Sequence, residues 1–414
     1  SVSSSFVFSE FIPANKVLSF GKLRLSWANV GSDENPYQLD FQYTAANTYY
    51  AQFSLNGTFP HGGVVGVTGP RIYPTADLEP QNASTIEVGS NIILFNNRIG
   101  IDFTYYSIMT TNQIISIDIP LSTGYFSRNV NVGAVSNKGI EADLHLALVR
   151  KPGGVNWNVD VNFNKNRQIV EELSEGLTEY QLDGGWSGLQ IKAAPGEEFG
   201  LYGTAWKRNE NGDIIINENT GLREINPGQR FGDIYPEWFM GINNTFSFKG
   251  VDLNFLIDIR QGGVFYSGTV GNLRSTGLAL ETAENREQSF IDVGVIELED
   301  GTYVANDVPV QSMQDFWSQY SSISNTEGNV FDASYVKLRE VRISYNLPKS
   351  MLKNTFIQGL RIGVEGRNLW LIKDYVPHLD PEMNFFGPAA VGEGVEFNSI
   401  PSVRSFGANL MLTF

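Results

Sequence analysis

The 414-residue chain contains no cysteine and only three histidines, which removes several classes of protein at once. Without cysteine it has neither a disulfide scaffold nor a thiolate metal site, and three histidines alone argue against a zinc site. The catalytic patterns H-E-x-x-H, G-x-S-x-G, the P-loop and G-x-G-x-x-G after a strand are also absent. The sequence therefore predicts a protein that is not an enzyme and that carries no cofactor or metal.

Positive charge and long apolar runs are scarce as well. The 29 Lys and Arg against 45 Asp and Glu give a formal net charge of −16, whereas nucleic-acid binding needs clustered Lys and Arg, so no nucleic acid is expected as a partner. No run of about 18 apolar residues occurs, which argues against a helical membrane protein. Any membrane span must then be a β-strand, and 12% aromatic residues with 42 Gly and 17 Pro favour strands and turns.

Residues 403–414 have the pattern of a transmembrane β-strand. Apolar residues alternate with small, mostly polar ones, from Phe406 through Leu410 to Phe414, so one face is apolar and the other polar without charge. A tilted strand of about 9 to 11 residues crosses the hydrocarbon of an outer membrane, with aromatic residues at its edges and polar groups facing a lumen. A chain that ends on such a strand suggests a barrel closed by its C-terminus.

The same alternation predicts ten full strands and one partial strand. The full strands cover 17–30, 85–94, 99–110, 139–149, 155–168, 238–248, 251–260, 334–347, 360–370 and 403–414, and the partial one covers 2–8. The long connections between them span 31–83, 111–137, 171–235, 263–333 and 371–401. Short turns that alternate with long loops are typical of bacterial outer-membrane barrels, whose long loops are extracellular. The expected fold class is therefore all-β, a transmembrane antiparallel β-barrel in the outer membrane of a bacterium.

Two features of this strand series are irregular. In 334–347 the alternation fails above Glu340, where Lys337 and Arg339 take the apolar parity, and we expect this upper part to project beyond the lipid. Ten or eleven strands also make an unusual barrel, because single-chain bacterial barrels have even strand numbers. Since the chain opens at Ser1 without an initiator Met or a signal segment, it is expected to be a fragment whose upstream strands are missing.

Several motifs, in order, resemble the C-terminal half of the barrel of SusC-like (SusC/RagA) TonB-dependent transporters of Bacteroidetes. They are 19–27 (SFGKLRLSW), 77–80 (DLEP) with 85–89 (TIEVG), 95–98 (FNNR) with 102–106 (DFTYY), 137–141 (NKGIE), 333–341 (ASYVKLREV), 346–348 (NLP), 366–370 (GRNLW), 380–382 (DPE) and 404–406 (RSF). Each motif is weak alone, but their order makes the resemblance specific over nearly the whole chain.

The resemblance implies part of a 22-stranded, plugged outer-membrane barrel that spans 1–414 of this chain. Such transporters import glycan oligosaccharides, or sometimes peptides, with a SusD-like lipoprotein as a lid and with energy from TonB. The plug and the segment that contacts TonB are not recognised in these residues. The alternative is a secreted, soluble β-rich glycan-binding protein or adhesin, which would need a continuous core and no lipid-facing belt.

Candidate functional residues fall into two sets. Charged side chains that strand parity directs toward the lumen are Asp102, Glu141, Asp160, Asp258, Arg260, Glu340, Arg342, Arg361, Glu365 and Arg367. Aromatic side chains in the long connections, which are candidates for substrate contact, include Tyr49, Tyr50, Trp186, Trp206, Tyr266, Trp317, Tyr375 and Phe386. A solvated wall against a plug and packing among loops explain most of them, whereas direct solute contact, stacking on a sugar face and burial under a lid are the functional alternatives.

Four further expectations concern single positions. Leu144, Val161, Ile257 and Leu410 should face hydrocarbon. Trp206 and Trp317 are expected to anchor the lid. His145 is expected to be a hydrogen-bonded lumen residue rather than a ligand or a proton relay. The oxygen-rich stretches 209–213 and 217–221 have a calcium-loop composition but lack the terminal bidentate Glu, so hairpin turns are predicted there.

Overall fold

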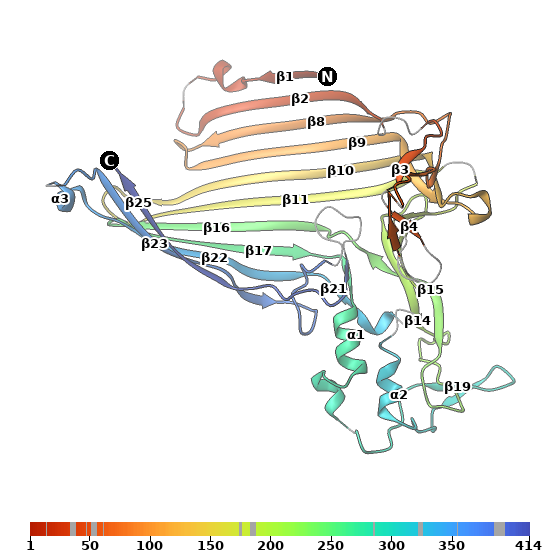
Figure 1. Ribbon diagram of the computed structural model, residues 1–414. Helices are drawn as coiled ribbons and strands as arrows, with labels where there is room; N and C mark the ends of the chain where they lie inside the picture. Colours follow the sequence, from red (N-terminus) through yellow and green to blue (C-terminus); the bar gives the residue numbers. More distant parts are fainter. Residues whose placement is uncertain are drawn as a thin grey trace.

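A single curved antiparallel sheet runs through the chain in the computed structural model (Figure 1). The structure describes residues 1–13, 15–33, 39–46, 48–50, 56–60, 62–173, 176–182, 188–284, 286–321, 326–353, 355–384 and 394–414. Consecutive strands of the sheet pair in the order β1 (Val2–Phe6), β2 (Leu18–Ser32), β8 (Gln81–Leu94), β9 (Ile99–Asp118), β10 (Ser127–Arg150), β11 (Asn156–Glu172), β16 (Trp238–Phe248), β17 (Val251–Gln261), β22 (Tyr335–Asn346), β23 (Gly359–Lys373) and β25 (Ser405–Thr413). The short β7 (Ile72–Tyr73) pairs with β10 in parallel.

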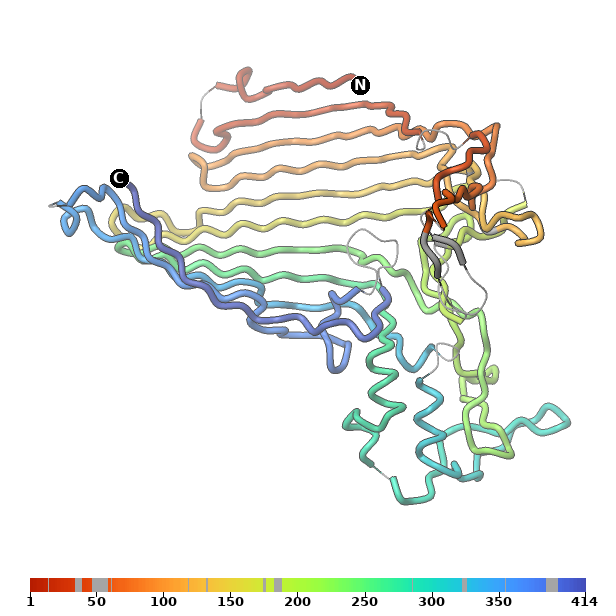
Figure 2. The backbone as a smooth tube through the Cα atoms, viewed as in Figure 1, coloured from red at the N-terminus to blue at the C-terminus, as the bar shows by residue number. Residues whose placement is uncertain are grey.

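Short turns gather at one end of this sheet and long connections at the other (Figure 2). The turns 95–98 and 249–250 are hairpins whose residues, including Asn96, Asn97 and Lys249, have the positive φ that tight hairpins use. The expected long connection 111–137 is mostly strand, because β9 continues to Asp118 and pairs there with Ser127 of β10. Only 119–126 joins these two strands.

One face of the sheet is apolar. A continuous cross-strand row runs at mid-height, because each residue pairs with the next across six strand boundaries: Ile92, Ile101, Leu144, Val161, Ile242, Ile257 and Leu338. Leu410 of β25 lies on the same face and is 63% exposed. The four side chains expected to face hydrocarbon therefore share one apolar surface, as a lipid-facing belt requires.

The opposite face is polar and concave. The row one residue further along the strands consists of Asn91, Asp102, Asp143, Asn162, Gly241, Asp258 and Lys337. A hollow of about 920 Å³ opens on this face, and its walls come from seven strands between β8 and β22. A hollow shared by so many neighbouring strands marks the inner side of the curved sheet.

The irregular parity in β22 comes from a β-bulge. Pairing with β17 passes from Leu256 opposite Glu340 to Ile257 opposite Leu338, so that Arg339 is skipped. A bulge adds one residue to one strand and exchanges its two faces from that point on. Lys337 therefore lies on the polar face, and β22 stays in the sheet up to Tyr335. The broken alternation thus has a local cause within the sheet, and the projection of this upper part beyond the lipid stays a prediction.

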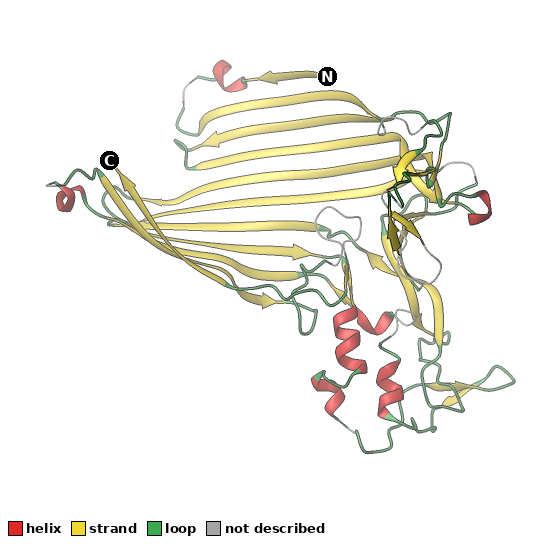
Figure 3. Cartoon of the chain, in the orientation of Figure 1, coloured by secondary structure: helices red, strands yellow, loops and turns green. Residues whose placement is uncertain are grey.

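The long connections carry most of the buried apolar side chains. They also contain helices and short strands of their own outside the large sheet (Figure 3). One connection forms a four-stranded sheet, and others form smaller sheets and helices. These elements are β12 (Tyr180–Leu182), β13 (Leu189–Ala193), β14 (Gly200–Trp206), β15 (Ile225–Asp233), β18 (Val264–Ser267), β21 (Val330–Asp332), β24 (Val395–Glu396), β19 (Val295–Glu297), β20 (Tyr303–Ala305), β3 (Thr44–Ala46), β6 (Gly66–Thr68), β4 (Thr48–Tyr50), β5 (Asn56–Thr58), α1 (Gly268–Ser275), α2 (Met313–Ser318) and, at the short-turn end, α3 (Lys349–Leu352). Short 3-10 helices cover Phe8–Phe11, Leu121–Thr123, Leu280–Ala283 and Glu327–Asn329. Across the described ranges, no helix is long and apolar enough to cross a membrane.

Candidate functional site

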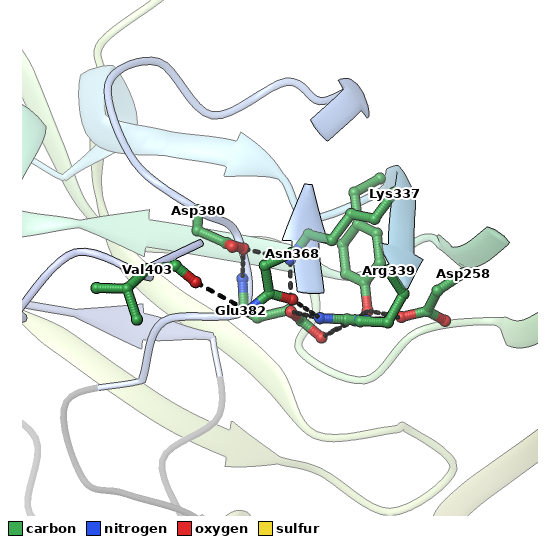
Figure 4. A network of polar contacts seen from close by, with 8 residues as sticks. Asp258, Lys337, Arg339, Asn368, Asp380, Glu382 and Val403 are labelled. Carbon is green, nitrogen blue, oxygen red and sulfur yellow. Dashed lines mark hydrogen bonds and ion pairs between the residues drawn. The ribbon is translucent and has the colours of Figure 1, made fainter. Parts of the chain in front are cut away.

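Lys337 is the centre of a charged network at the loop end of the sheet (Figure 4). Its Nζ lies 2.5 Å from Asp380 Oδ1 and 2.5 Å from Glu382 Oε2, and its side chain is only 4% exposed. Arg339, the bulge residue, donates to Glu382 Oε1 at 2.6 Å and also binds Asp258. The network thus joins β17 and β22 to the connection 374–404.

Two more side chains complete this network. The Tyr335 hydroxyl donates to Glu382 Oε1 at 2.8 Å, and Asn368 accepts from Arg339 at 3.2 Å while it donates to the Val403 carbonyl at 3.3 Å. Asn368 has positive φ, at a second irregularity in the pairing of β22 with β23. Three of the sequence motifs, 333–341, 366–370 and 380–382, therefore meet in one structural cluster.

The electrostatics of the network favour ionised carboxylates. Burial alone would raise the pKa of Glu382, but hydrogen bonds from Arg339 and Lys337 outweigh it and lower the pKa to about 2. In contrast, burial and the neighbouring Asp380 carboxylate raise the pKa of Asp374. The cluster holds the last long connection over the end of the sheet rather than offering a free charge to a ligand.

The other end of the same connection is fixed by Glu396, which is 1% exposed. Its carboxylate accepts hydrogen bonds from Ser267 Oγ at 2.8 Å, Thr269 Oγ1 at 2.5 Å and the Ser399 amide at 2.8 Å. Ser267 is also the N-cap residue of α1. The connection 374–404 is therefore held both at the sheet and at α1.

Lower on the polar face, charges of β17, β22 and β23 compensate one another. Arg342 lies 3.0 Å from Glu340 and 3.2 Å from Glu365. Arg367 lies 3.4 Å from Glu340, and Arg361 lies 3.3 Å from Asp252. These three arginines remain open to solvent, so each pair contributes at most about 1 kcal/mol to stability.

The remaining predicted lumen residues also lie on the polar face. Asp102 binds Arg24 and accepts from Asn91 at 2.8 Å, and Glu141 accepts from Asn164 at 3.4 Å. Asp160 Oδ1 lies 2.5 Å from His145 Nδ1, so His145 is a hydrogen-bonded side chain of this face, as expected.

Arg260, the last of the predicted lumen set, points toward the loop end of the sheet. Its guanidinium donates to the Ile234 carbonyl at 3.3 Å and stands 5.8 Å from the ring centroid of Phe239. All ten lumen candidates thus share one face, but they form separate local contacts rather than one site.

The structure separates the predicted loop aromatics. Trp206 is 4% and Tyr266 1% exposed, so both belong to loop cores and neither surface is open to a solute or a lid. The ring centroids of Trp317 and Tyr320 are 5.2 Å apart, and Trp317 packs against the buried cluster that contains Trp206 and Tyr320. Tyr375 is 46% exposed, with the Lys373 ammonium 4.9 Å from its ring.

The four remaining aromatic candidates for substrate contact lie in two places. Tyr49 and Tyr50 form the end of β4, and Trp186 and Phe386 lie outside the described residues. Sequence reasoning also passed over aliphatic loop residues that are far more exposed than the buried aromatics, among them Leu280 and Val293. Aliphatic composition carries no signal for such exposure, since the same residue types fill the loop cores.

A second hollow, of about 810 Å³, lies at the loop end of the sheet, where β11 continues past its pairing with β16. Lys165, Asn166 and Arg167 of β11 line it, and Phe231 and Phe331 contribute from the connections. In the part of the chain that the structure describes, no group of three or more His, Asp or Glu side chains is arranged to hold a metal.

Residues 19–369 match the family model of the TonB dependent receptor-like β-barrel. The chain belongs to this family. Among curated relatives, TonB-dependent receptor P3 of Formosa agariphila is 26% identical over 435 residues, which cover 98% of this chain and 40% of the relative. TonB-dependent receptor P26 of the same organism is 25% identical, and the match covers 100% of this chain and 42% of the relative. The chain thus spans about two fifths of the length of these relatives.

Solved structures agree with this TonB-dependent receptor fold. The RagAB peptide transporter superposes with a TM-score of 0.73 at 21% identity, covering 100% of this chain and 43% of that chain. The RagAB peptide importer in its closed-closed state superposes with a TM-score of 0.72 at 20% sequence identity. The predicted family, the all-β barrel fold and the outer-membrane location are confirmed, and the family consists of transporters rather than enzymes.

Proposed function

We propose that this chain forms part of the wall of a TonB-dependent outer-membrane transporter of the SusC/RagA type, which imports a nutrient oligomer, most simply a glycan oligosaccharide. The supporting observation is the two-faced sheet, with an unbroken apolar row outside and a polar, hollow face inside. Peptide import is the second candidate, because the fold matches that of the RagAB peptide transporter.

The sheet itself calls for additional strands. Strands β1 and β25 form its two edges, and an unpaired backbone group in hydrocarbon costs several kcal/mol. We propose that further strands of the same protein pair with both edges and close a barrel around a plug. Energy would come from TonB through a segment outside these residues.

The long connections supply the surface for a lid. We propose that a SusD-like lipoprotein docks on them through an interface of more than about 2,000 Å². Because Trp206 lies in a core, exposed aliphatic loop residues such as Leu280 are better anchor candidates. Purification from mild detergent tests this partner, and recovery of the barrel alone under every mild condition would contradict it.

Gene deletion in the host bacterium tests import directly. The deletion strain should lose growth on one polysaccharide and regain it with a plasmid copy, while growth on glucose stays unchanged. A defect confined to peptide medium would favour the second candidate. Normal growth on every polysaccharide and peptide medium would contradict import. Release of the protein from membranes by carbonate without detergent would contradict the barrel.

A further inference from the structure

Basic side chains line the short-turn end of the large sheet. The five short connections at this end cover 7–17, 95–98, 151–155, 249–250 and 347–358 (Figure 2). Each of them contains at least one Lys or Arg. Their basic residues, here called the turn cations, are Lys16, Arg98, Lys151, Lys249, Lys349 and Lys353. Against these six cations the five connections contain a single acidic residue, Glu10.

This excess of cations runs against the composition of the chain. The whole sequence has 45 Asp and Glu but only 29 Lys and Arg. Asp is also among the residues that tight turns favour, because its side chain hydrogen-bonds the local backbone. An acidic side chain keeps a turn soluble as well as a basic one does. Neither turn formation nor solubility therefore accounts for a basic short-turn end.

The turn cations are exposed, and the protein leaves their charges uncompensated. All six residues are exposed to solvent, and none of them forms an ion pair with a residue that the structure describes. On the concave face, in contrast, Arg24, Arg342 and Arg361 each contact a carboxylate. The turn cations are therefore available to an anionic partner outside this chain.

The turn cations form a row rather than a compact patch. The five connections join β1 to β2, β8 to β9, β10 to β11, β16 to β17 and β22 to β23, and these hairpins follow one another in the sheet. Neighbouring strands lie about 4.8 Å apart, so successive hairpins are about 10 Å apart. A row that follows the rim of the sheet suits a membrane surface, which meets every hairpin, better than a compact soluble partner.

Aromatic rings at the same end mark the level of the membrane surface. The exposed rings there are those of Phe95, Phe248, Phe356 and Phe414. Lys249 Nζ lies 5.2 Å from the centroid of the Phe248 ring, so a turn cation stands directly beside this aromatic group. Aromatic girdles lie at the two interfaces of an outer-membrane barrel, and Lys and Arg reach from such a position into the headgroup region. The turn cations are thus placed at the level of lipid phosphate groups.

We propose that the turn cations bind the phosphate groups of anionic glycerophospholipids in the membrane leaflet that faces the periplasm. Short turns are the periplasmic end of such barrels. Phosphate oxygens accept strong, charge-assisted hydrogen bonds from Lys and Arg, and the attractions of several basic residues to an anionic surface add together. This lipid site goes beyond the import function and does not depend on the imported solute.

The test measures which lipid the purified protein retains. The full-length protein is extracted in mild detergent, immobilised and equilibrated with equal amounts of phosphatidylglycerol, which is anionic, and phosphatidylethanolamine, which is zwitterionic. Mass spectrometry then quantifies the bound lipids. The wild type should retain at least fivefold more phosphatidylglycerol than phosphatidylethanolamine. The triple variant Arg98→Gln, Lys151→Gln and Lys249→Gln, which removes the cations of three successive hairpins, should at least halve this ratio.

A matched control removes the same charges at the other end of the sheet. Arg128, Lys138 and Lys373 are also exposed, and none of them forms an ion pair with a described residue. Their combined change to Gln should leave the lipid ratio unaltered. Equal retention of the two lipids by the wild type, an unchanged ratio in the turn variant or an equal fall in the control would overturn the lipid site. A deletion strain that grows normally would contradict import alone, because the lipid ratio is measured on purified protein.

The wild type alone provides a second measurement if the turn variant folds poorly. Raising the salt concentration of the wash from about 0.1 M to about 1 M shortens the Debye length from about 10 Å to about 3 Å. The excess of phosphatidylglycerol should then fall at least twofold, while the retained phosphatidylethanolamine stays constant. A lipid ratio that does not change with salt would overturn recognition of the phosphate charge by the turn cations.

Discussion

Replacing Lys337 with alanine should release the connection 374–404 from the end of the sheet. The side chain is 4% exposed and its ammonium serves both Asp380 and Glu382. Removal of one partner from a buried ion pair costs about 3–5 kcal/mol. Because Glu382 keeps its hydrogen bonds from Arg339, we expect the lower end, about 3 kcal/mol. At about 1.4 kcal/mol per factor of ten, local opening should become about 100-fold more frequent.

Hydrogen exchange measured by mass spectrometry follows this opening. The Glu382 amide donates to Asp380 Oδ1 and the Met383 amide to the Asp380 carbonyl, both at 3.0 Å, so both should exchange faster in Lys337→Ala. Lys373→Ala is the matched control, since Lys373 is exposed to solvent and its ammonium lies beside the Tyr375 ring. Exchange in Lys337→Ala within threefold of the wild type would refute the anchoring role of the network.

Three further changes test other parts of the structure. Ile257→Arg should lower the stability of the folded barrel by about 2–4 kcal/mol, because Ile257 lies on the lipid face whereas Asn254 does not. On heat-modifiability gels it should therefore fold less completely than Asn254→Arg. Equal folding of the two variants would reverse the assignment of the faces. Trp206→Ala should cost about 3–5 kcal/mol and lower the thermal unfolding temperature, and loss of a partner without destabilisation would contradict its place in a core. The lowered pKa of Glu382 contributes stability that is complete above about pH 4.5 and is lost as the pH falls toward about 2. Pepsin should therefore cleave the connection 374–404 faster as the pH approaches 2. A cleavage rate that does not change with pH would contradict the ion pairs.

The strands were predictable where they cross lipid. A period-two pattern with one apolar face gives both the position and the direction of each side chain, and the range 238–248 coincides with β16. Strands β9 and β10 extend well past their expected ends. Val130 and Val132 alternate there with Asn129 and Asn131, and Val130 packs with Ile115 in a small core. Period-two alternation thus continues beyond the predicted boundary of β10.

The network around Lys337 was not predictable in the same way. Its ion pairs join residues more than 40 positions apart in sequence, and only pairing in space unites Lys337 with Asp380. The sequence did carry one signal, the parity break at Arg339, but only the register shows that a β-bulge causes it. The aromatic loop residues posed a similar problem, because composition does not distinguish a loop that has its own core from one that awaits a partner.

Charge compensation on the concave face bears on how a solute is recognised there. Arg24 with Asp102, Arg342 with Glu365 and Arg361 with Asp252 cancel locally, although the whole chain is strongly acidic. Paired charges at solvent-open positions leave little field at a distance, and salt screens what remains beyond about 8 Å. Asp143 and Arg150 also line the hollow and are not among these pairs, so a group there meets both charged and neutral hydrogen-bonding side chains.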